Sequence, residues 1–335
     1  MKSKNTVGKE PSYGRLLGLI VLLTVTWGIV PAFGKLANMP GDVTTFYVNI
    51  TALIALVLII SFMKYEGTDG VVRRYWTKLK DYSFKDYGLM VAIGVVWPLV
   101  YSLLYFQAIY EGEPVGMTIL NYTWPLIVIG LAILKYRKKA YYLSKAGVKF
   151  IIPVILTVTA VVFYQMDATI SFTARIMVMG LIAALTQALF NFIDHGYDNW
   201  IALFVIEATT VVFIVPIMIF TTHYTMVPSW ESLGLMSIIG VVGNAIGFWV
   251  FMEGRRESKG LVDKGVMTSE PIWLASQGIV PISVLVTMFI TNLVSKDGQR
   301  FVITTNQIIS LVVLAIGLVL FFIFKSVEDR KKKKT

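Results

Sequence analysis

Two glutamates lie inside apolar stretches of the sequence. Glu207 follows Trp200 by seven residues, about 10 Å along a helix, and so would lie about a third of the way into a ~30 Å hydrocarbon core. Ionisable groups at such depth are costly and usually functional. Glu207 is therefore a candidate for coupling to protons or ions; the alternative is a protonated acid in a structural hydrogen bond. Glu270 opens a stripe with Trp273 and Gln277 at i, i+3 and i+7. This spacing predicts one wall of a binding site, unless Glu270 is a first-turn acid at the membrane interface.

A second group of candidates surrounds a proline. Asn121, Tyr122 and Trp124 precede Pro125, and Pro271 lies at the corresponding place in a later apolar run. Proline frees a carbonyl group and loosens a helix at membrane depth. Tyr and Trp rings offer broad apolar faces that can stack on an aromatic ligand or hold a cation. We expect these side chains to line a binding cavity; the alternative is packing of bulky rings between helices.

Further candidates follow from helical spacing. Trp97, Tyr101 and Tyr105 recur at i, i+4 and i+8 on one helix face, where core packing and cavity lining are both open. Amides inside a membrane turn toward partners rather than lipid, and small residues allow close helix packing. The amides are Gln187 and Asn191, one helical turn apart, and Asn244. The small residues are Gly240, Gly243 and Gly247, which surround Asn244 in the sequence and are expected to allow close packing. We expect Asn191 and Asn244 to face the cavity or to join helices.

The composition excludes several kinds of chemistry. The 335 residues include no cysteine, so no disulfide, thiolate metal site or cysteine nucleophile can form. The two histidines, His195 and His223, lie near the ends of apolar runs, and neither a metal site nor a cofactor is expected. With 56% hydrophobic residues, 15% charged residues and a mean hydropathy of +0.71, the chain is too apolar for a soluble domain. We predict an all-α integral membrane protein.

Ten apolar runs can form spanning helices, since bare backbone cannot face lipid. The runs are 16–36, 44–63, 87–109, 117–134, 150–166, 176–193, 201–220, 233–252, 266–294 and 302–324. A β-barrel would instead show ten-residue alternation.

The distribution of charge predicts orientation. With ten helices, 26 of the 30 Lys and Arg residues lie in segments on the side of the N-terminus, and only Lys35, Arg175, Lys296 and Arg300 lie on the other. By the positive-inside rule both termini are cytoplasmic, and the expected location is the plasma membrane. The net charge of +10 thus indicates orientation and not nucleic-acid binding. The tail Lys331–Lys334 is expected to bind anionic lipid.

The sequence repeats itself. Residues 88–96 match 234–242 at seven of nine positions, an offset of 146 that also aligns Pro125 with Pro271. Residues 18–24 match 180–186 at an offset of 162. Each copy would hold five helices, an odd number, so the second must enter the membrane inverted, which is typical of secondary transporters. The predicted organisation is a tail at 1–15, a first repeat at 16–166, an inverted repeat at 167–324 and a basic tail at 325–335; the alternative is a duplication kept only for packing.

The string Asn121-Tyr122-Thr123-Trp124-Pro125 resembles the drug/metabolite transporter superfamily, in its EamA-type group of ten-helix carriers. Trp27-Gly28, with Lys35 eight residues on, is similar to the first helix of that superfamily. The string is most like the branch of bacterial aromatic amino-acid exporters. The second copy departs from it, since Glu270 stands where the first copy has Trp124.

The resemblance implies a secondary transporter that exports small organic metabolites, with amino acids as the best candidates, by alternating access. A polyspecific drug or quaternary-amine carrier, and an importer of the same fold, are alternatives within that class. A membrane-embedded transferase is the alternative from another class, but the loops near 65–85 and 135–149 hold no cluster of His, Asp or Arg suited to catalysis. A channel is a further alternative, without a visible filter sequence. We expect a small-molecule substrate, a monomer, and no enzyme activity.

Overall fold

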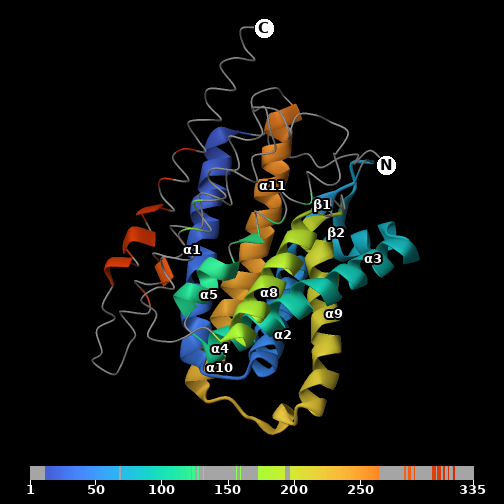
Figure 1. Cartoon of the computed structure of the whole chain (residues 1–335). Coiled ribbons are helices and arrows are strands. Elements are labelled where there is room, and N and C mark those ends of the chain that lie inside the picture. The colour runs from blue at the N-terminus through green and yellow to red at the C-terminus, as the bar shows by residue number, and fades with distance from the viewer. Residues whose placement is uncertain are drawn as a thin grey trace.

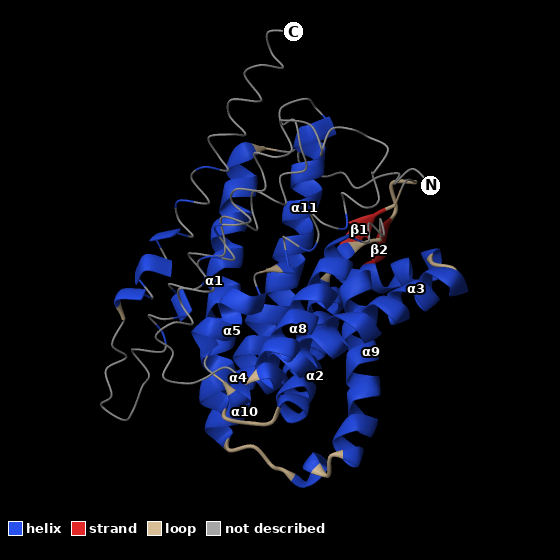
Figure 2. Ribbon diagram, in the orientation of Figure 1, coloured by secondary structure: helices blue, strands red, loops and turns tan. Residues whose placement is uncertain are grey.

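The computed structural model describes residues 12–67, 69–112, 114–121, 123–124, 173–192 and 197–263, with isolated positions elsewhere. In this part of the chain, helices predominate and a single small hairpin supplies the strands (Figures 1 and 2). The α-helices are α1 (Tyr13–Ala37), α2 (Gly41–Phe62), α3 (Phe84–Gly94), α4 (Tyr101–Glu111), α5 (Pro114–Asn121), α8 (Ala174–Phe192), α9 (Asn199–Phe220), α10 (Trp230–Ile238) and α11 (Gly247–Asp263).

Five continuous helical stretches of the described chain are long and apolar enough to cross a membrane. They are Gly14–Ala37, Gly41–Phe62, Phe84–Glu111, Asn199–Phe220 and Trp230–Ser258. A shorter apolar helix covers Ala174–Phe190. The apolar runs predicted at 16–36, 44–63, 87–109, 176–193, 201–220 and 233–252 are thus helical. The run at 117–134 is described mainly at its start, and the other three only at isolated positions, so the count of ten stays a prediction.

Two of the spans contain a π-helical segment. Val95–Val100 (η2) joins α3 to α4, and Ile239–Ile246 (η4) joins α10 to α11. Within η2, Trp97 has φ −149° and ψ 126°, outside the helical region. Pro98 explains this break, because proline disfavours the helical conformation of the preceding residue and has no N–H to donate.

The basic segment predicted as a loop at 65–85 is folded. Strands β1 (Lys64–Glu66) and β2 (Val72–Arg74) pair antiparallel, and a 3₁₀ helix, η1 (Tyr75–Asp81), follows. The Tyr75 hydroxyl donates to Asp198 Oδ2 at 2.6 Å, and Lys78 Nζ donates to the same oxygen at 2.7 Å. Burial, then the charge of Asp198, raises the pKa of Tyr75. The hairpin is thereby attached to the start of α9.

Tyr82 also contacts this junction. Its hydroxyl accepts a hydrogen bond from the Asp198 backbone N–H at 3.0 Å, and burial raises the pKa of Tyr82 to about 12. Asp198 in turn caps α9, because its Oδ1 accepts from the N–H groups of Trp200 and Ile201.

Helices α2 and α9 correspond residue by residue. Both have 22 residues, and Gly41–Phe62 maps onto Asn199–Phe220 at an offset of 158. Buried positions coincide at this offset in eight pairs: Val43/Ile201, Thr44/Ala202, Thr45/Leu203, Val48/Ile206, Asn49/Glu207, Ala52/Thr210, Leu56/Ile214 and Ile60/Met218. The two helices pack against each other and run antiparallel, since the start of α2 meets the end of α9.

The interrupted spans correspond as well, at the offset of 146 found in the sequence. Ser83 caps α3 by accepting from the Asp86 N–H, and Ser229 caps α10 by accepting from the Ser232 N–H.

Two glycines at equivalent positions of these spans make equivalent close contacts. A Cβ on Gly94 would lie 2.9 Å from Thr209 Cβ and 3.0 Å from the Ile206 carbonyl oxygen of α9. A Cβ on Gly240 would collide with Thr51 and the Val48 carbonyl oxygen of α2, which are the counterparts of Thr209 and Ile206 at the offset of 158. The predicted role of Gly240, Gly243 and Gly247 in close packing is confirmed, because an added Cβ would also collide with Val30 at Gly243 and with Trp27 at Gly247.

Polar contacts join helix ends on both sides of the bundle. At one end Arg15 of α1 pairs with Glu253 at 2.8 Å and with Glu257 at 3.4 Å, both on α11. These pairs explain why α11 continues well beyond the apolar run that ends at 252. At the other end Asp42 accepts from Thr221 Oγ1 at 2.5 Å and pairs with His223 at 2.9 Å.

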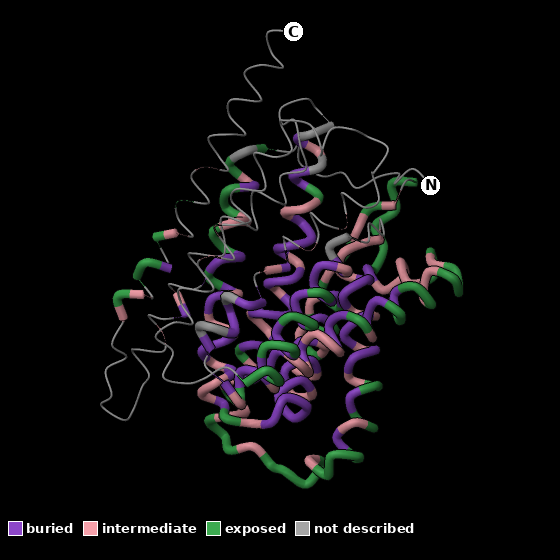
Figure 3. The backbone as a smooth tube through the Cα atoms, in the orientation of Figure 1, coloured by how far each residue is buried: buried purple, intermediate pink, exposed green. Residues whose placement is uncertain are grey.

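The burial pattern suits a lipid environment. Buried residues lie where helices meet, and exposed ones lie on the outer faces and the end loops (Figure 3). Many outer residues are large and apolar: Leu17 on α1 is 61% exposed, Ile54 on α2 53% and Val212 on α9 65%. Water would penalise such surfaces, whereas acyl chains do not.

Candidate functional site

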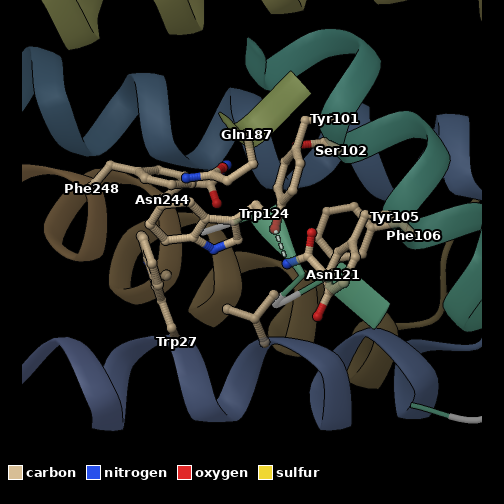
Figure 4. A pocket seen from close by; sticks show the side chains of 12 residues that line it. Trp27, Tyr101, Ser102, Tyr105, Phe106, Asn121, Trp124, Gln187, Asn244 and Phe248 are labelled. Carbon is tan, nitrogen blue, oxygen red and sulfur yellow. Dashed lines mark hydrogen bonds between the residues drawn. The ribbon is translucent and has the colours of Figure 1, made fainter. Parts of the chain in front are cut away.

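A cavity lies between helices of both halves of the chain (Figure 4). Its volume is about 480 Å³, counting the part that opens outward, and little of it is wide enough for water. The lining residues are Trp27, Val30, Tyr101, Ser102, Tyr105, Phe106, Asn121, Trp124, Gln187, Gly243, Asn244 and Phe248. Because Trp27 and Asn244 lie near the middle of their spans, the cavity is at mid-height of the bundle.

Two polar atoms at the cavity lack a partner among the described residues. They are the indole N–H of Trp27, on α1, and the amide oxygen Oδ1 of Asn121, at the end of α5. Both atoms are inaccessible to water, and a buried polar group without a hydrogen bond costs about 1–3 kcal/mol. One donor and one acceptor without a described partner thus belong to residues that line the same cavity.

Aromatic faces surround these two atoms. The rings of Tyr101 and Tyr105 stack at 5.4 Å with an angle of 10° between them. The Tyr101 hydroxyl accepts from Asn121 Nδ2 at 3.0 Å, which fixes the direction of the free Asn121 oxygen. Trp124 is 1% exposed and lies edge-on to Phe251 at 6.3 Å. In Figure 4, Trp27 and Tyr101 approach this space from opposite helices, with Asn121 and Trp124 between them.

Below this space, an aromatic cluster supports the cavity. Trp97 is fully buried, stacks on Phe190 at 3.8 Å and meets Phe248 edge-on at 4.2 Å. Its indole N–H donates to Gln187 Oε1 at 2.5 Å. Trp97 therefore belongs to the core, whereas Tyr101, whose ring centroid lies 6.4 Å from that of Trp97, and Tyr105 line the cavity.

A second polar group lies deeper. Asn244 Nδ2 donates to Asn49 Oδ1 at 3.3 Å, and Asn49 Nδ2 donates to the Thr45 carbonyl at 2.6 Å. Glu207 is fully buried in α9, does not line the cavity, and neither of its carboxyl oxygens has a partner in the described part of the chain.

The structure brings together five of the predicted binding residues: Asn121, Trp124, Tyr101, Tyr105 and Asn244. Asn191 lies on α8, but its side chain is outside the described set. The other predicted residues are also outside it: Tyr122, Pro125, Glu270, Pro271, Trp273 and Gln277.

Sequence reasoning did not assign Trp27, Ser102, Phe106, Phe248 or Asn49 to the site. Asn49 carried a signal, since it is a lone amide within the apolar run at 44–63. Apart from the family resemblance, nothing in the sequence indicated that Trp27 lines the cavity, because its position there depends on how α1 packs against the other helices.

The bundle and its central cavity define a multi-pass helical membrane protein. Residues 15–160 match the model of the EamA-like transporter family. That family consists of membrane transporters of small molecules.

Comparisons with other proteins add only the fold. No curated protein matches the sequence. A crystal structure described without any activity matches with a TM-score of 0.54 and 12% identity, covering 94% of this chain and 99% of that chain.

Proposed function

We propose that the chain is a secondary transporter that exports small amphipathic metabolites by alternating access, with aromatic amino acids as the leading substrates. The observation that carries this proposal is the cavity, whose lining combines aromatic rings with an indole N–H and an amide oxygen that have no partner among the described residues. An amino acid supplies a carboxylate for the Trp27 N–H and an ammonium group for Asn121 Oδ1. Its side chain would stack on Tyr101 or Trp124.

Alternating access requires two halves that can rock about the site. We propose ten helices in two inverted repeats of five, with both termini cytoplasmic in the plasma membrane. The antiparallel pairing of α2 with its counterpart α9 supports this arrangement, as do the equivalent contacts of Gly94 and Gly240. An in-plane two-fold axis would relate such pairs. The narrow cavity suits an occluded state, which must widen before a substrate can enter.

Quaternary amines are the second candidate substrates. None of the twelve lining residues carries a charge, and six of them are aromatic. A cation without hydrogen-bond donors would be held by the π faces of Trp27, Tyr101 and Trp124, and it would leave the Trp27 N–H unused. The two classes therefore differ in their dependence on that N–H.

The test is a thermal-shift screen of the purified protein against amino acids, nucleosides, quaternary amines and sugar phosphates. We expect stabilisation by L-tryptophan or L-phenylalanine. Trp27→Phe should abolish that response, because phenylalanine cannot donate to a carboxylate. Stabilisation by tetramethylammonium or tetraethylammonium that survives Trp27→Phe would favour the amine carrier. Stabilisation by sugar phosphates alone would contradict both candidates.

A further inference from the structure

Glu207 has a structural counterpart in the other half of the chain. At the offset of 158 that superimposes the buried positions of α2 and α9, Glu207 corresponds to Asn49. Both side chains are fully buried. The chain thus places a carboxyl group in one copy where it has an amide in the other.

The two residues also lie at similar heights where α2 and α9 meet. Leu56 shares an apolar cluster with Leu203, and Val43 shares another with Ile214. Interpolating along the antiparallel helices at 1.5 Å per residue places Glu207 within about one turn, ~5 Å, of the height of Asn49.

Asn49 connects this level to the cavity. Its Oδ1 accepts from Asn244 Nδ2, and Asn244 is one of the residues that line the cavity. The side chains of Asn244 and Asn49 therefore form a polar link between the cavity and the crossing of α2 with α9. A ligand that competes for the Asn244 amide changes the hydrogen bonding of Asn49.

Glu207 itself is in an apolar setting. Its carboxyl oxygens have no hydrogen-bond partner among the described residues, and no described cation pairs with it. Among the described side chains, the ionisable groups on elements that contact α9 are Asp42 and Tyr47 (α2), Tyr75, Lys78, Lys80 and Asp81 (η1), Lys85, Asp86 and Tyr87 (α3), His223 and Tyr224 (η3), and Glu253, Arg255, Arg256 and Glu257 (α11). The acids Asp42, Asp86 and Glu253 are bonded at the helix ends.

A carboxylate in such a setting is stable only if it gains a proton, a cation or water. Among the described residues, Glu207 belongs to no group of three or more His, Cys, Asp or Glu side chains that could hold a metal ion. In the occluded state a proton is therefore the simplest occupant, and it can leave only when the conformation changes.

We propose that Glu207 carries the coupling proton of transport and that the Asn49–Asn244 hydrogen bond links its protonation to the occupancy of the cavity. One O–H bond forms when Glu207 faces one side of the membrane and breaks when it faces the other. This inference rests on the proposed function for its substrate.

The first test uses Glu207→Gln in proteoliposomes with L-tryptophan as the probe. The amide keeps the shape of the side chain and cannot titrate. We expect the variant to exchange labelled for unlabelled tryptophan, a reaction that moves no net proton. We expect the tryptophan accumulation that a pH gradient drives to be at least tenfold lower in this variant, whichever side of the membrane is acidic. The matched control is Glu231→Gln, an exposed acid at the start of α10, which should accumulate tryptophan as the unmodified protein does.

A second measurement needs no substrate. Infrared difference spectra between acidic and alkaline buffer should contain a carboxylic-acid C=O band that is present with Glu231→Gln and missing with Glu207→Gln. If no variant moves tryptophan, the proposed substrate is wrong, and this band alone decides the role of Glu207. A Glu207 band that does not change with pH would overturn the proposal, as would gradient-driven accumulation by Glu207→Gln, or accumulation driven by a sodium gradient alone.

Discussion

The close approach of helices at Gly94 allows a stability prediction with a matched control. A Cβ at this position would lie 2.9 Å from Thr209 Cβ and 3.0 Å from the Ile206 carbonyl oxygen, whereas ordinary contacts begin at 3.4 Å. The Ile206 oxygen belongs to the backbone of α9 and cannot rotate away. Gly94→Ala must therefore separate α3 from α9 by about 0.4–0.5 Å, and such a gap loses about a quarter of the dispersion attraction between facing atoms.

Overpacking of this kind costs about 1–3 kcal/mol. The same substitution removes the flexibility of glycine in a helix, which stabilises by about 0.5–1 kcal/mol. The control is Gly88→Ala, six residues earlier on α3, where a Cβ meets nothing within 4 Å. It should show only the stabilising term, so Gly94→Ala should unfold about 1–3 kcal/mol more easily than Gly88→Ala.

The assay is thermal unfolding of both purified variants in the same detergent. We expect the melting temperature to fall for Gly94→Ala and to rise slightly for Gly88→Ala. The second copy should repeat the pattern, with a fall for Gly240→Ala and a rise for Gly234→Ala, because Gly234 is also open. Equal shifts at Gly88 and Gly94 would refute the close packing of α3 on α9.

Three further predictions concern the two ends of the bundle. Because the chain has no native cysteine, Val227→Cys and Val72→Cys each give a single thiol, at sites that are 89% and 64% exposed. A membrane-impermeant maleimide added to intact cells should label only Val227→Cys. Labelling of both variants would contradict the predicted orientation. The folded-state pKa of Tyr82, about 12, lies above its ordinary value of 10.0, so the stability that its protonated form contributes is complete below pH 10 and is lost as pH rises toward 12. Tyr82→Phe should therefore be less sensitive to alkaline unfolding. An unchanged pH midpoint of unfolding would count against this. Arg15→Gln should lower the free energy of unfolding by roughly 1–2 kcal/mol, since it leaves Glu253 and Glu257 without the cation that they share. Recovery of stability by a second change, Glu253→Gln, would distinguish this cause from general damage to the fold.

The hydropathy of the sequence predicted the described helices well. The runs at 16–36 and 201–220 begin within three residues of α1 and α9, because the length of an apolar segment is set by the membrane that it crosses. Their polar ends were less predictable. The part of α11 beyond the apolar run carries ion pairs to Arg15, a residue distant in sequence that hydropathy does not connect to it.

The candidate site was predictable by residue type but not by geometry. Asn121, Tyr101 and Trp124 stood out as polar or aromatic residues near mid-span, and they do line one cavity. The partners of these residues depend on how the helices cross. Trp27 reaches the cavity only because Gly247 lets α11 approach α1, and the packing of Gly247 on Trp27 has no signal in local spacing.

The same limit applies to the interrupted spans. The aromatic spacing from Trp97 to Tyr105 left core packing and cavity lining open, and the structure divides the three residues between them, with Trp97 in the core and Tyr101 and Tyr105 at the cavity. Pro98 held the information, because proline constrains the residue before it. The equivalent irregularity at η4 has no proline, so only the repeated sequence could have suggested it.

The central claim is that the cavity between the two halves binds the transported molecule. The most direct test is counterflow of radiolabelled L-tryptophan into proteoliposomes that contain the unmodified protein, Trp124→Ala or Trp230→Ala. Trp230 is 90% exposed at the start of α10 and serves as the matched tryptophan control. Loss of a stacking ring should weaken binding by roughly 1–2 kcal/mol, about tenfold in affinity. We expect protein-dependent counterflow whose half-saturating concentration rises about tenfold in Trp124→Ala and stays the same in Trp230→Ala. Counterflow no faster than in empty liposomes, or equal affinity in the three proteins, would contradict it.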